Sequence, residues 1–147
     1  MNTQQLELYM LSDPYIREVY GGVVAYDQLP ILVVSRPRIF IVNTEPISEP
    51  GDHWIVLYFD HNVCEHFDSS GSVPRTTYMP YIFVNSVKFM YNNERLQHYN
   101  SDTCGLFCLF YAYFRCRGFL FNQILDMFYD NLLLNEFVVK TFYNLTV

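Results

Sequence analysis

Cys104 is the residue whose position in the chain is best suited to nucleophilic chemistry. It stands in Asn100-Ser-Asp-Thr-Cys-Gly105, where a long apolar helix is predicted to begin. The unpaired N–H groups and partial positive charge of a helix N-terminus lower the pKa of a thiol, and the thiolate is its reactive form. Gly105 would let a substrate backbone approach closely, and the Cys104 amide could donate to an oxyanion. Position alone nevertheless favours a simpler interpretation, a small apolar residue in a buried helix.

A predicted β-hairpin brings a histidine opposite an acid. Residues 53–59 and 62–68 are rich in β-branched and aromatic side chains, and Asp60-His61 between them fits a two-residue turn. Counting back along both strands from that turn places His53 opposite Asp68. Opposed Cβ atoms lie about 4.5–5.5 Å apart, which is within reach of an imidazole–carboxylate hydrogen bond. Such a bond fixes the tautomer of the ring and favours its protonated form. The alternative is a surface contact without consequence.

The remaining candidates for chemistry are one amide and a set of thiols. Gln97 lies seven residues before Cys104, and a side-chain amide N–H can stabilise a developing oxyanion. On its own, a glutamine in a short strand indicates nothing. A metal site is not expected, because the only set that could converge lacks the spacing of common zinc sites: Cys64, His66, Cys104 and Cys108. No cofactor is predicted.

The elements around these residues indicate an α+β fold. Helices are predicted over residues 4–11, 79–91 and 102–117, and again beyond Asn122, where Leu125, Phe128 and Tyr129 have core spacing. Strands are predicted over residues 29–35, 38–42, 53–59, 62–68 and 96–99. We therefore expect a mixed central β-sheet packed against the helix that carries Cys104. No repeat or linker divides the sequence, so residues 1–147 are expected to form one domain.

Composition and charge argue against several classes of protein. Hydrophobic residues make up 51% of the chain, enough to fill a core, so disorder is not expected. The net charge is −6 and the basic residues are scattered, which disfavours nucleic acid as the main ligand. The longest apolar run, Leu106 to Phe114, is far short of the roughly 20 residues of a membrane span. No signal peptide is recognisable, so we expect an intracellular protein with reduced cysteines and no membrane association.

Four short segments and one glutamine occur in an order that resembles a known family. They are Ile41-Val-Asn-Thr44, Gly51-Asp-His-Trp54, Cys64-Glu-His-Phe-Asp-Ser-Ser-Gly71, Gln97 and Asp102-Thr-Cys-Gly-Leu-Phe-Cys108. This succession is similar to that of the adenovirus endopeptidases (adenains) and, more distantly, to that of the SUMO-specific proteases that share their core. The resemblance covers roughly residues 5–120. It implies the fold of these enzymes and the hydrolysis of peptide bonds by a cysteine nucleophile.

The resemblance also implies a role for each residue. Cys104 would be the nucleophile, and His53 the general base that later protonates the leaving amine. Asp68 would orient His53, at a position where adenains typically carry Glu. Gln97 and the Cys104 amide would form the oxyanion hole. Trp54 would wall a narrow groove that admits small residues such as Gly beside the scissile bond.

The expected substrates are viral or virus-derived precursor proteins, processed in the virion or in the host nucleus. The alternatives are an isopeptidase for ubiquitin-like modifiers, which would use the same groove, and a catalytically idle binding module. Adenovirus enzymes are activated by DNA and by a basic peptide held through a disulfide. Residues 80–96 contain no cysteine, so that disulfide is not expected here, although an activating peptide stays open as a partner. Glu65 also stays open as an alternative to Asp68.

Overall fold

Five strands and six α-helices make up the chain, and the computed structural model describes all of residues 1–147. In chain order the elements are α1 (Thr3–Ser12), α2 (Pro14–Arg17), β1 (Tyr20–Ala25), the 3₁₀ turn η1 (Tyr26–Gln28), β2 (Arg38–Asn43), β3 (Trp54–Asp60), β4 (Val63–Phe67), α3 (Met79–Asn85), β5 (Lys88–Tyr91), α4 (Cys104–Arg115), α5 (Phe121–Leu125) and α6 (Leu132–Thr146). None of these helices combines the length and the apolar character needed to span a bilayer.

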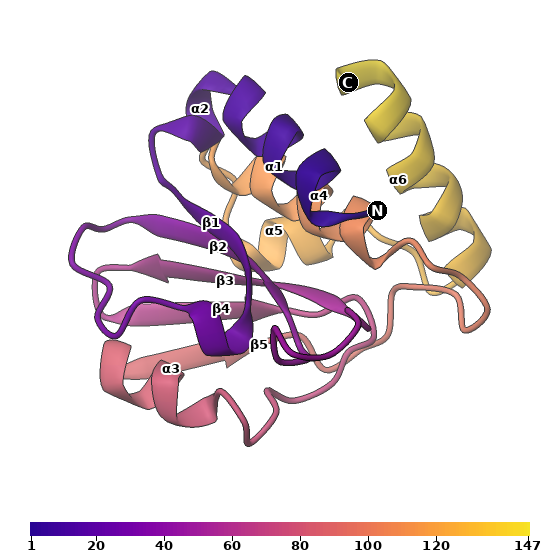
Figure 1. The fold of residues 1–147 in the computed structure, drawn as a ribbon. Coiled ribbons are helices and arrows are strands. Elements are labelled where there is room, and N and C mark those ends of the chain that lie inside the picture. Colours follow the sequence, from indigo (N-terminus) through magenta and orange to yellow (C-terminus); the bar gives the residue numbers. More distant parts are fainter.

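The strands form one mixed sheet in the order β1-β2-β3-β4-β5. The central strand β3 is antiparallel to both of its neighbours, β2 and β4, whereas the edge strands β1 and β5 run parallel to β2 and β4, respectively. Helix α3 lies on one face of the sheet, and α1, α4 and α6 lie on the other (Figure 1). This arrangement confirms the α+β fold with a mixed central sheet packed against the cysteine-bearing helix.

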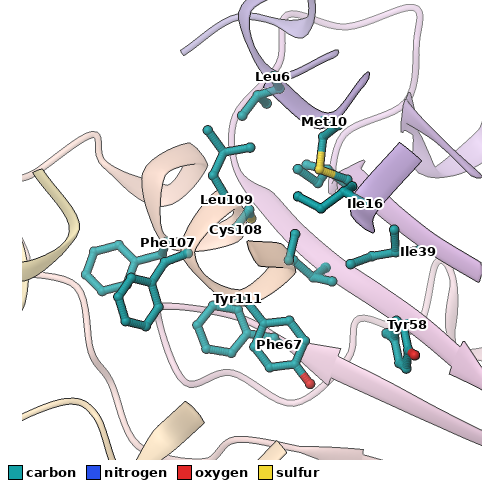
Figure 2. Packing of buried hydrophobic residues seen from close by; sticks show 14 of the residues in the cluster. Leu6, Met10, Ile16, Ile39, Tyr58, Phe67, Phe107, Cys108, Leu109 and Tyr111 are labelled. Carbon is teal, nitrogen blue, oxygen red and sulfur yellow. The ribbon is translucent and has the colours of Figure 1, made fainter. Parts of the chain in front are cut away.

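Side chains of the central strands alternate between two apolar clusters. Ile39 and Ile41 of β2 join the larger cluster, which contains α1 and α4, whereas Phe40 and Val42 join the smaller cluster beneath α3. Figure 2 shows part of the larger cluster, where residues of α4 meet the sheet and α1. Because helices cover both faces, the strand sequences are nearly continuous apolar runs.

Helix α4 is the centre of the larger cluster. Nine of its 12 residues are buried, and it packs against β3, α1, α5 and α6. An all-round apolar sequence is expected for a helix enclosed in this way. The helix ends near Gly118, whose φ of 96° is readily adopted only by glycine. Its first residue is Cys104, so the prediction of a helix that begins close to this residue is confirmed.

Several predicted elements are wrong because tertiary contacts override local pattern. Residues 29–35 form no strand; Val33 donates its amide to the Asn85 side chain at 2.8 Å. Strand β1 was missed because it contains two glycines, and the ring of Phe40 fills the space that a Cβ on Gly21 would need. The helix predicted over 79–91 stops at Asn85, and its second half becomes β5 beside β4.

The end of the chain differs from prediction in the same way. Residues 96–99 are a bent loop rather than a strand. The tail beyond Asn122 does form helices, α5 and α6, but Tyr129 is exposed instead of buried.

The hairpin turn lies one residue further along than predicted. His61-Asn62 forms the turn, in place of Asp60-His61. Moving a two-residue turn by one position shifts the pairing by two residues, an even number, so every side chain keeps its face. The shift places Asp68 diagonally across from His53 rather than directly opposite. Diagonal neighbours remain within reach of long side chains.

Candidate active site

A polar cleft of about 660 Å³ opens at one end of the sheet. At this end β3 begins, β4 has just ended and α4 begins, so residues distant in sequence come together. The cleft is lined by Met1, Asn2, Thr3, Asn43, Gly51, Asp52, His53, Trp54, Ser70, Arg75, Arg95, Gln97, Ser101, Asp102 and Cys104. Four of these lining residues were candidate site residues in the sequence: His53, Trp54, Gln97 and Cys104.

His53 and Asp68 form a hydrogen bond across the strand ends. His53 Nε2 lies 2.6 Å from Asp68 Oδ1, and 17% of the His53 side chain is exposed. Burial by itself lowers the pKa of His53, but hydrogen bonds with Asp68 and Cys104 and the charges of these groups raise it to about 9. The same contact holds the pKa of Asp68 below its usual range, although burial opposes this. The pair is thus favoured as imidazolium and carboxylate.

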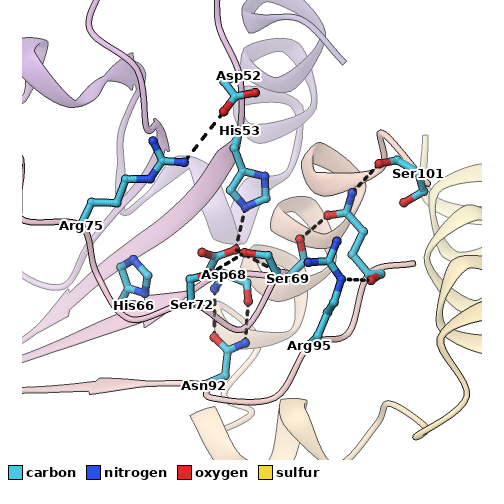
Figure 3. Close-up of polar contacts among 12 residues, drawn as sticks. Asp52, His53, His66, Asp68, Ser69, Ser72, Arg75, Asn92, Arg95 and Ser101 are labelled. Atoms are coloured by element: carbon cyan, nitrogen blue, oxygen red, sulfur yellow. Dashed lines mark hydrogen bonds and ion pairs between the residues drawn. The ribbon is translucent and has the colours of Figure 1, made fainter. Parts of the chain in front are cut away.

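Neighbouring residues fix the Asp68 carboxylate and backbone. Ser70 donates to Asp68 Oδ1 through its amide at 2.8 Å and its hydroxyl at 2.7 Å. Asn92 accepts from the Asp68 amide at 2.9 Å and donates to its carbonyl at 2.6 Å (Figure 3). With donors on one carboxylate oxygen and both backbone groups engaged, Asp68 is held in one orientation toward His53.

Cys104 lies in the first turn of α4, next to the imidazole. Burial raises the pKa of its thiol, but His53 and the amides of Trp54 and Gly105 outweigh burial, so the pKa lies below the ordinary value. Because Nε2 of His53 is bound to Asp68, Nδ1 is the ring nitrogen left to exchange a proton with the thiol. The arrangement favours a thiolate paired with an imidazolium.

The side chain of Gln97 is fixed at both ends of its amide. Its Oε1 accepts from Ser69 Oγ at 2.6 Å, and its Nε2 donates to the Ser101 carbonyl at 2.9 Å. One N–H of the amide group is left over, and Gln97 lines the same cleft as Cys104. The Gln97 carbonyl accepts from Arg95 Nε at 2.7 Å, which anchors the backbone as well (Figure 3).

The two residues expected to contact substrate differ in position. Trp54 lines the cleft, and its indole N–H donates to the Met1 carbonyl at 3.1 Å. Gly105 is not among the residues that line the cleft, and its approach to a substrate backbone stays a prediction. A Cβ at Gly105 would lie 3.2 Å from Met1 and 3.3 Å from Leu6. The glycine is therefore explained by close packing of the N-terminal segment on α4.

Glu65 has a different environment from Asp68. It accepts hydrogen bonds from Arg115 Nε at 3.0 Å and from the Tyr111 hydroxyl, both on α4. The structure thus brings Asp68, and not Glu65, to His53. The thiols do not converge either, since Cys64 and Cys108 belong to clusters on opposite faces of the sheet. No group of three or more His, Cys, Asp or Glu residues is placed to hold a metal ion.

Sequence reasoning missed the residues that hold this site together. Ser69, Ser70, Asn92 and Ser101 each bond to a candidate catalytic residue. Two of them directly follow Asp68, and that adjacency was a usable signal. Nothing in the sequence indicated Asn92, because its partner is 24 residues away.

No protein-family model matches the sequence, and no curated protein matches it. Solved structures do. The crystal structure of ASFV pS273R protease aligns with a TM-score of 0.59 at 16% identity, over 90% of this chain and 64% of that one. SUMO protease Ulp1, with its catalytic cysteine oxidised to a sulfinic acid, aligns with a TM-score of 0.51 at 13% identity, over 86% of this chain and 73% of that one.

These alignments establish the fold. The chain shares the fold of pS273R protease and of SUMO protease Ulp1, so the expected likeness to the SUMO-specific enzymes is confirmed at the level of the fold. The chain spans less than two thirds of the length of pS273R protease, 64% of it. The narrower likeness to adenovirus endopeptidases stays a prediction.

Proposed function

We propose that the protein is a cysteine peptidase of the adenain type, with Cys104 as its nucleophile. One observation carries the proposal: a thiol of lowered pKa lies beside an imidazole that is bound at 2.6 Å to the buried carboxylate of Asp68, at the wall of a cleft. The raised pKa of His53, about 9, and the lowered pKa of Cys104 together favour the thiolate–imidazolium pair at neutral pH.

In the acylation step, Cys104 Sγ attacks the carbonyl carbon of the scissile bond. A C–S bond forms, and the carbonyl oxygen becomes an oxyanion. This oxyanion accepts hydrogen bonds from the Gln97 side-chain amide and from the Cys104 backbone N–H. The Cys104 amide is available because the first N–H groups of a helix have no partner within it. His53 Nδ1 then donates its proton to the leaving nitrogen as the C–N bond breaks, which releases an amine and leaves a thioester.

In the deacylation step, water replaces the amine. His53 Nδ1 takes a proton from the water as its oxygen attacks the thioester carbonyl, and the C–S bond breaks to release a carboxylic acid and regenerate the thiolate. Asp68 keeps the second proton of the ring on Nε2 throughout, so Nδ1 always faces the reaction.

The substrate class we propose is a polypeptide cut after a small residue such as Gly, in a viral or virus-derived precursor. Trp54 and Gly51 line the cleft together with His53, and we expect the Trp54 indole to wall a groove that admits only small side chains beside the scissile bond. An isopeptidase for ubiquitin-like modifiers is the second candidate, because the fold is shared with a SUMO protease and such modifiers end in Gly-Gly. Both candidates use the same thiol.

The direct test needs no knowledge of the substrate. The rate of iodoacetamide labelling would be measured at each cysteine against pH, with mass spectrometry to assign the site. We expect fast labelling of Cys104 at about pH 6, because the imidazolium of His53 stabilises the thiolate. The variant His53→Ala should be labelled much more slowly. Cys108 is the internal control, since burial raises the pKa of its thiol. A Cys104 that titrates like a free thiol, near about 8.5, would favour the idle binding module.

Substrates would then separate the two enzymes. A fluorogenic peptide ending in Gly-Gly and a folded ubiquitin-like conjugate would be offered to the wild type and to Cys104→Ala. Turnover of the peptide supports the endopeptidase, and turnover of the conjugate alone supports the isopeptidase. Activity that persists in Cys104→Ala would contradict both.

A further inference from the structure

A carboxylate from the C-terminal helix is buried against the loop that leads to Cys104. Glu136 of α6 is 6% exposed. It accepts three hydrogen bonds, from the His98 amide at 3.0 Å, the Ser101 hydroxyl at 3.1 Å and the Thr103 hydroxyl at 2.7 Å. No basic side chain forms an ion pair with it. Burying a carboxylate costs free energy. We therefore look for the role of Glu136 in the segment that carries its three donors.

The preceding residue of α6 acts on the other side of Gln97. Asn135 is fully buried, and its Nδ2 donates to the Leu96 carbonyl at 3.1 Å. Its side chain is itself fixed by two hydrogen bonds to the backbone of Tyr129, at 2.7 and 2.8 Å. Two consecutive residues of one helix therefore bind the backbone immediately before and immediately after Gln97.

The loop needs such support because residues 92–103 belong to no helix or strand. Within it, Gln97 Nε2 donates to the Ser101 carbonyl, so the position of Ser101 sets the position of the amide. Thr103, the N-cap residue of α4, makes no capping hydrogen bond with its side chain. Its hydroxyl donates to Glu136 instead, although an N-cap threonine ordinarily binds the backbone of its own helix.

We propose that Glu136 is a positioning residue for the oxyanion hole. It holds residues 98–103 so that the Gln97 amide and the Cys104 backbone N–H converge on the same point of the cleft. Glu136 does not line that cleft, and it acts only through the loop. The inference rests on the proposed peptidase activity and assigns a role to the C-terminal helix.

The first test compares Glu136→Ala with Glu136→Gln at a temperature where both are folded. For Glu136→Ala we expect kcat to fall by about 10- to 100-fold, with KM changed by less than about 2-fold, because a small misplacement of transition-state donors affects kcat. Glu136→Gln should keep most of the activity. Its amide oxygen can accept from His98 and Ser101 while its NH₂ donates to the Thr103 hydroxyl. Lys140→Ala, at an exposed position of the same helix, is the control.

The second test separates positioning from general damage. Alkylation of Cys104 by iodoacetamide is displacement at a saturated carbon and forms no oxyanion, so Glu136→Ala should label within about 3-fold of the wild type. In a double-mutant cycle, adding Glu136→Ala to Gln97→Ala should cost clearly less than adding it to the wild type, because part of its effect acts through the Gln97 amide.

Three results would overturn the inference: a kcat for Glu136→Ala equal to that of the wild type, parallel losses in turnover and labelling, or additive effects in the cycle. Absence of Cys104-dependent turnover in the wild type would instead overturn the proposed function, and the inference with it.

Discussion

His53 and His66 are both largely buried, yet their pKa values move in opposite directions. His53 has a pKa of about 9, whereas burial lowers that of His66 to about 4. Burial disfavours the charged ring in both cases. The difference lies in the partner: His53 is bound to the Asp68 carboxylate, and His66 lies 3.0 Å from the neutral hydroxyl of Tyr78. At His53 the bound carboxylate outweighs burial, whereas the more deeply buried His66 has no charged group bound to it.

The two rings also differ in what they can reach. His53 lies on the cleft wall beside the Cys104 thiol. His66 is inside β4 and faces the cluster under α3, where its Nδ1 has no partner and its ring stacks on that of Tyr78. These differences support the proposal that His53 transfers protons and that His66 has a structural role.

The largest effect is expected when the reactive pair is removed. Cys104→Ser and His53→Ala should each lower turnover by about 10³-fold or more with the fold intact, because residues of a triad act as a unit. The matched control is the double variant His66→Phe/Tyr78→Phe, which replaces the other histidine and its partner by apolar rings. It should retain activity close to that of the wild type. Substrate hydrolysis and circular dichroism would measure both properties, and persistent turnover in Cys104→Ser would remove the assignment.

A smaller loss is expected when the partner of His53 becomes neutral. Asp68→Asn should lower kcat by about 10- to 10³-fold while leaving measurable activity, because this residue orients the ring and stabilises its charge. The pKa of His53 should fall below 9, since the Asp68 hydrogen bond and charge raise it. Titration of the ring by NMR tests this directly. An unchanged pKa would mean that Cys104 alone raises it.

Stability should depend on pH through His66. An unfolded histidine titrates near about 6.5, and the folded pKa is about 4, so the unfolded state binds more protons between these values. The stabilising contribution of neutral His66 is complete above the unfolded pKa and is lost as pH falls from about 6.5 toward 4. Between about pH 7 and pH 5 the wild type should lose about 2 kcal/mol more than His66→Phe/Tyr78→Phe. Urea unfolding of both proteins measures the difference; equal losses would contradict the role given to His66.

The smallest effect is expected at a hydrogen-bond donor to Asp68. Ser70→Ala removes the hydroxyl at 2.7 Å but keeps the amide donor at 2.8 Å. A hydrogen bond to a charged group contributes about 1.5–3 kcal/mol, but the Ser70 amide still holds the carboxylate, so kcat should fall by only about 2- to 5-fold. Ser72→Ala is the control, because the Ser72 hydroxyl contacts only that of Ser70, at 3.2 Å. Equal rates for both variants would show that the Ser70 amide alone orients the carboxylate.

The sequence predictions succeeded where the interactions are between residues close in sequence, and failed where they are between distant residues. The helix start near Cys104 and the shared face of His53 and Asp68 were predictable because apolar periodicity, turns and strand alternation depend on neighbouring residues. An error of one residue in the turn did no harm, because the shift in pairing was even. Gln97 lines the cleft with Cys104, its role in an oxyanion hole stays a prediction, and its predicted strand is a loop.

Glu136 and Asn92 were beyond prediction for a physical reason. The hydrogen bond from Thr103 to Glu136 spans 33 residues, and that from Asn92 to Asp68 spans 24. Polar side chains of this kind are mostly solvated, and only the packing of α6 and the course of the chain after β5 bury these two beside the cleft.

The amino-acid sequence was sufficient to predict the α+β class, the apolar helix that follows Cys104 and the candidates His53, Asp68 and Gln97. Local propensity and apolar periodicity depend on neighbouring residues, so they are recognisable without the fold. The three-dimensional structure was needed to show that Asp68 rather than Glu65 contacts His53 and that Gly105 packs against the N-terminal segment. It was also needed to show that α6 contacts the loop before Cys104. Those choices depend on which segments become neighbours in space, and burial then determines which polar groups must pair.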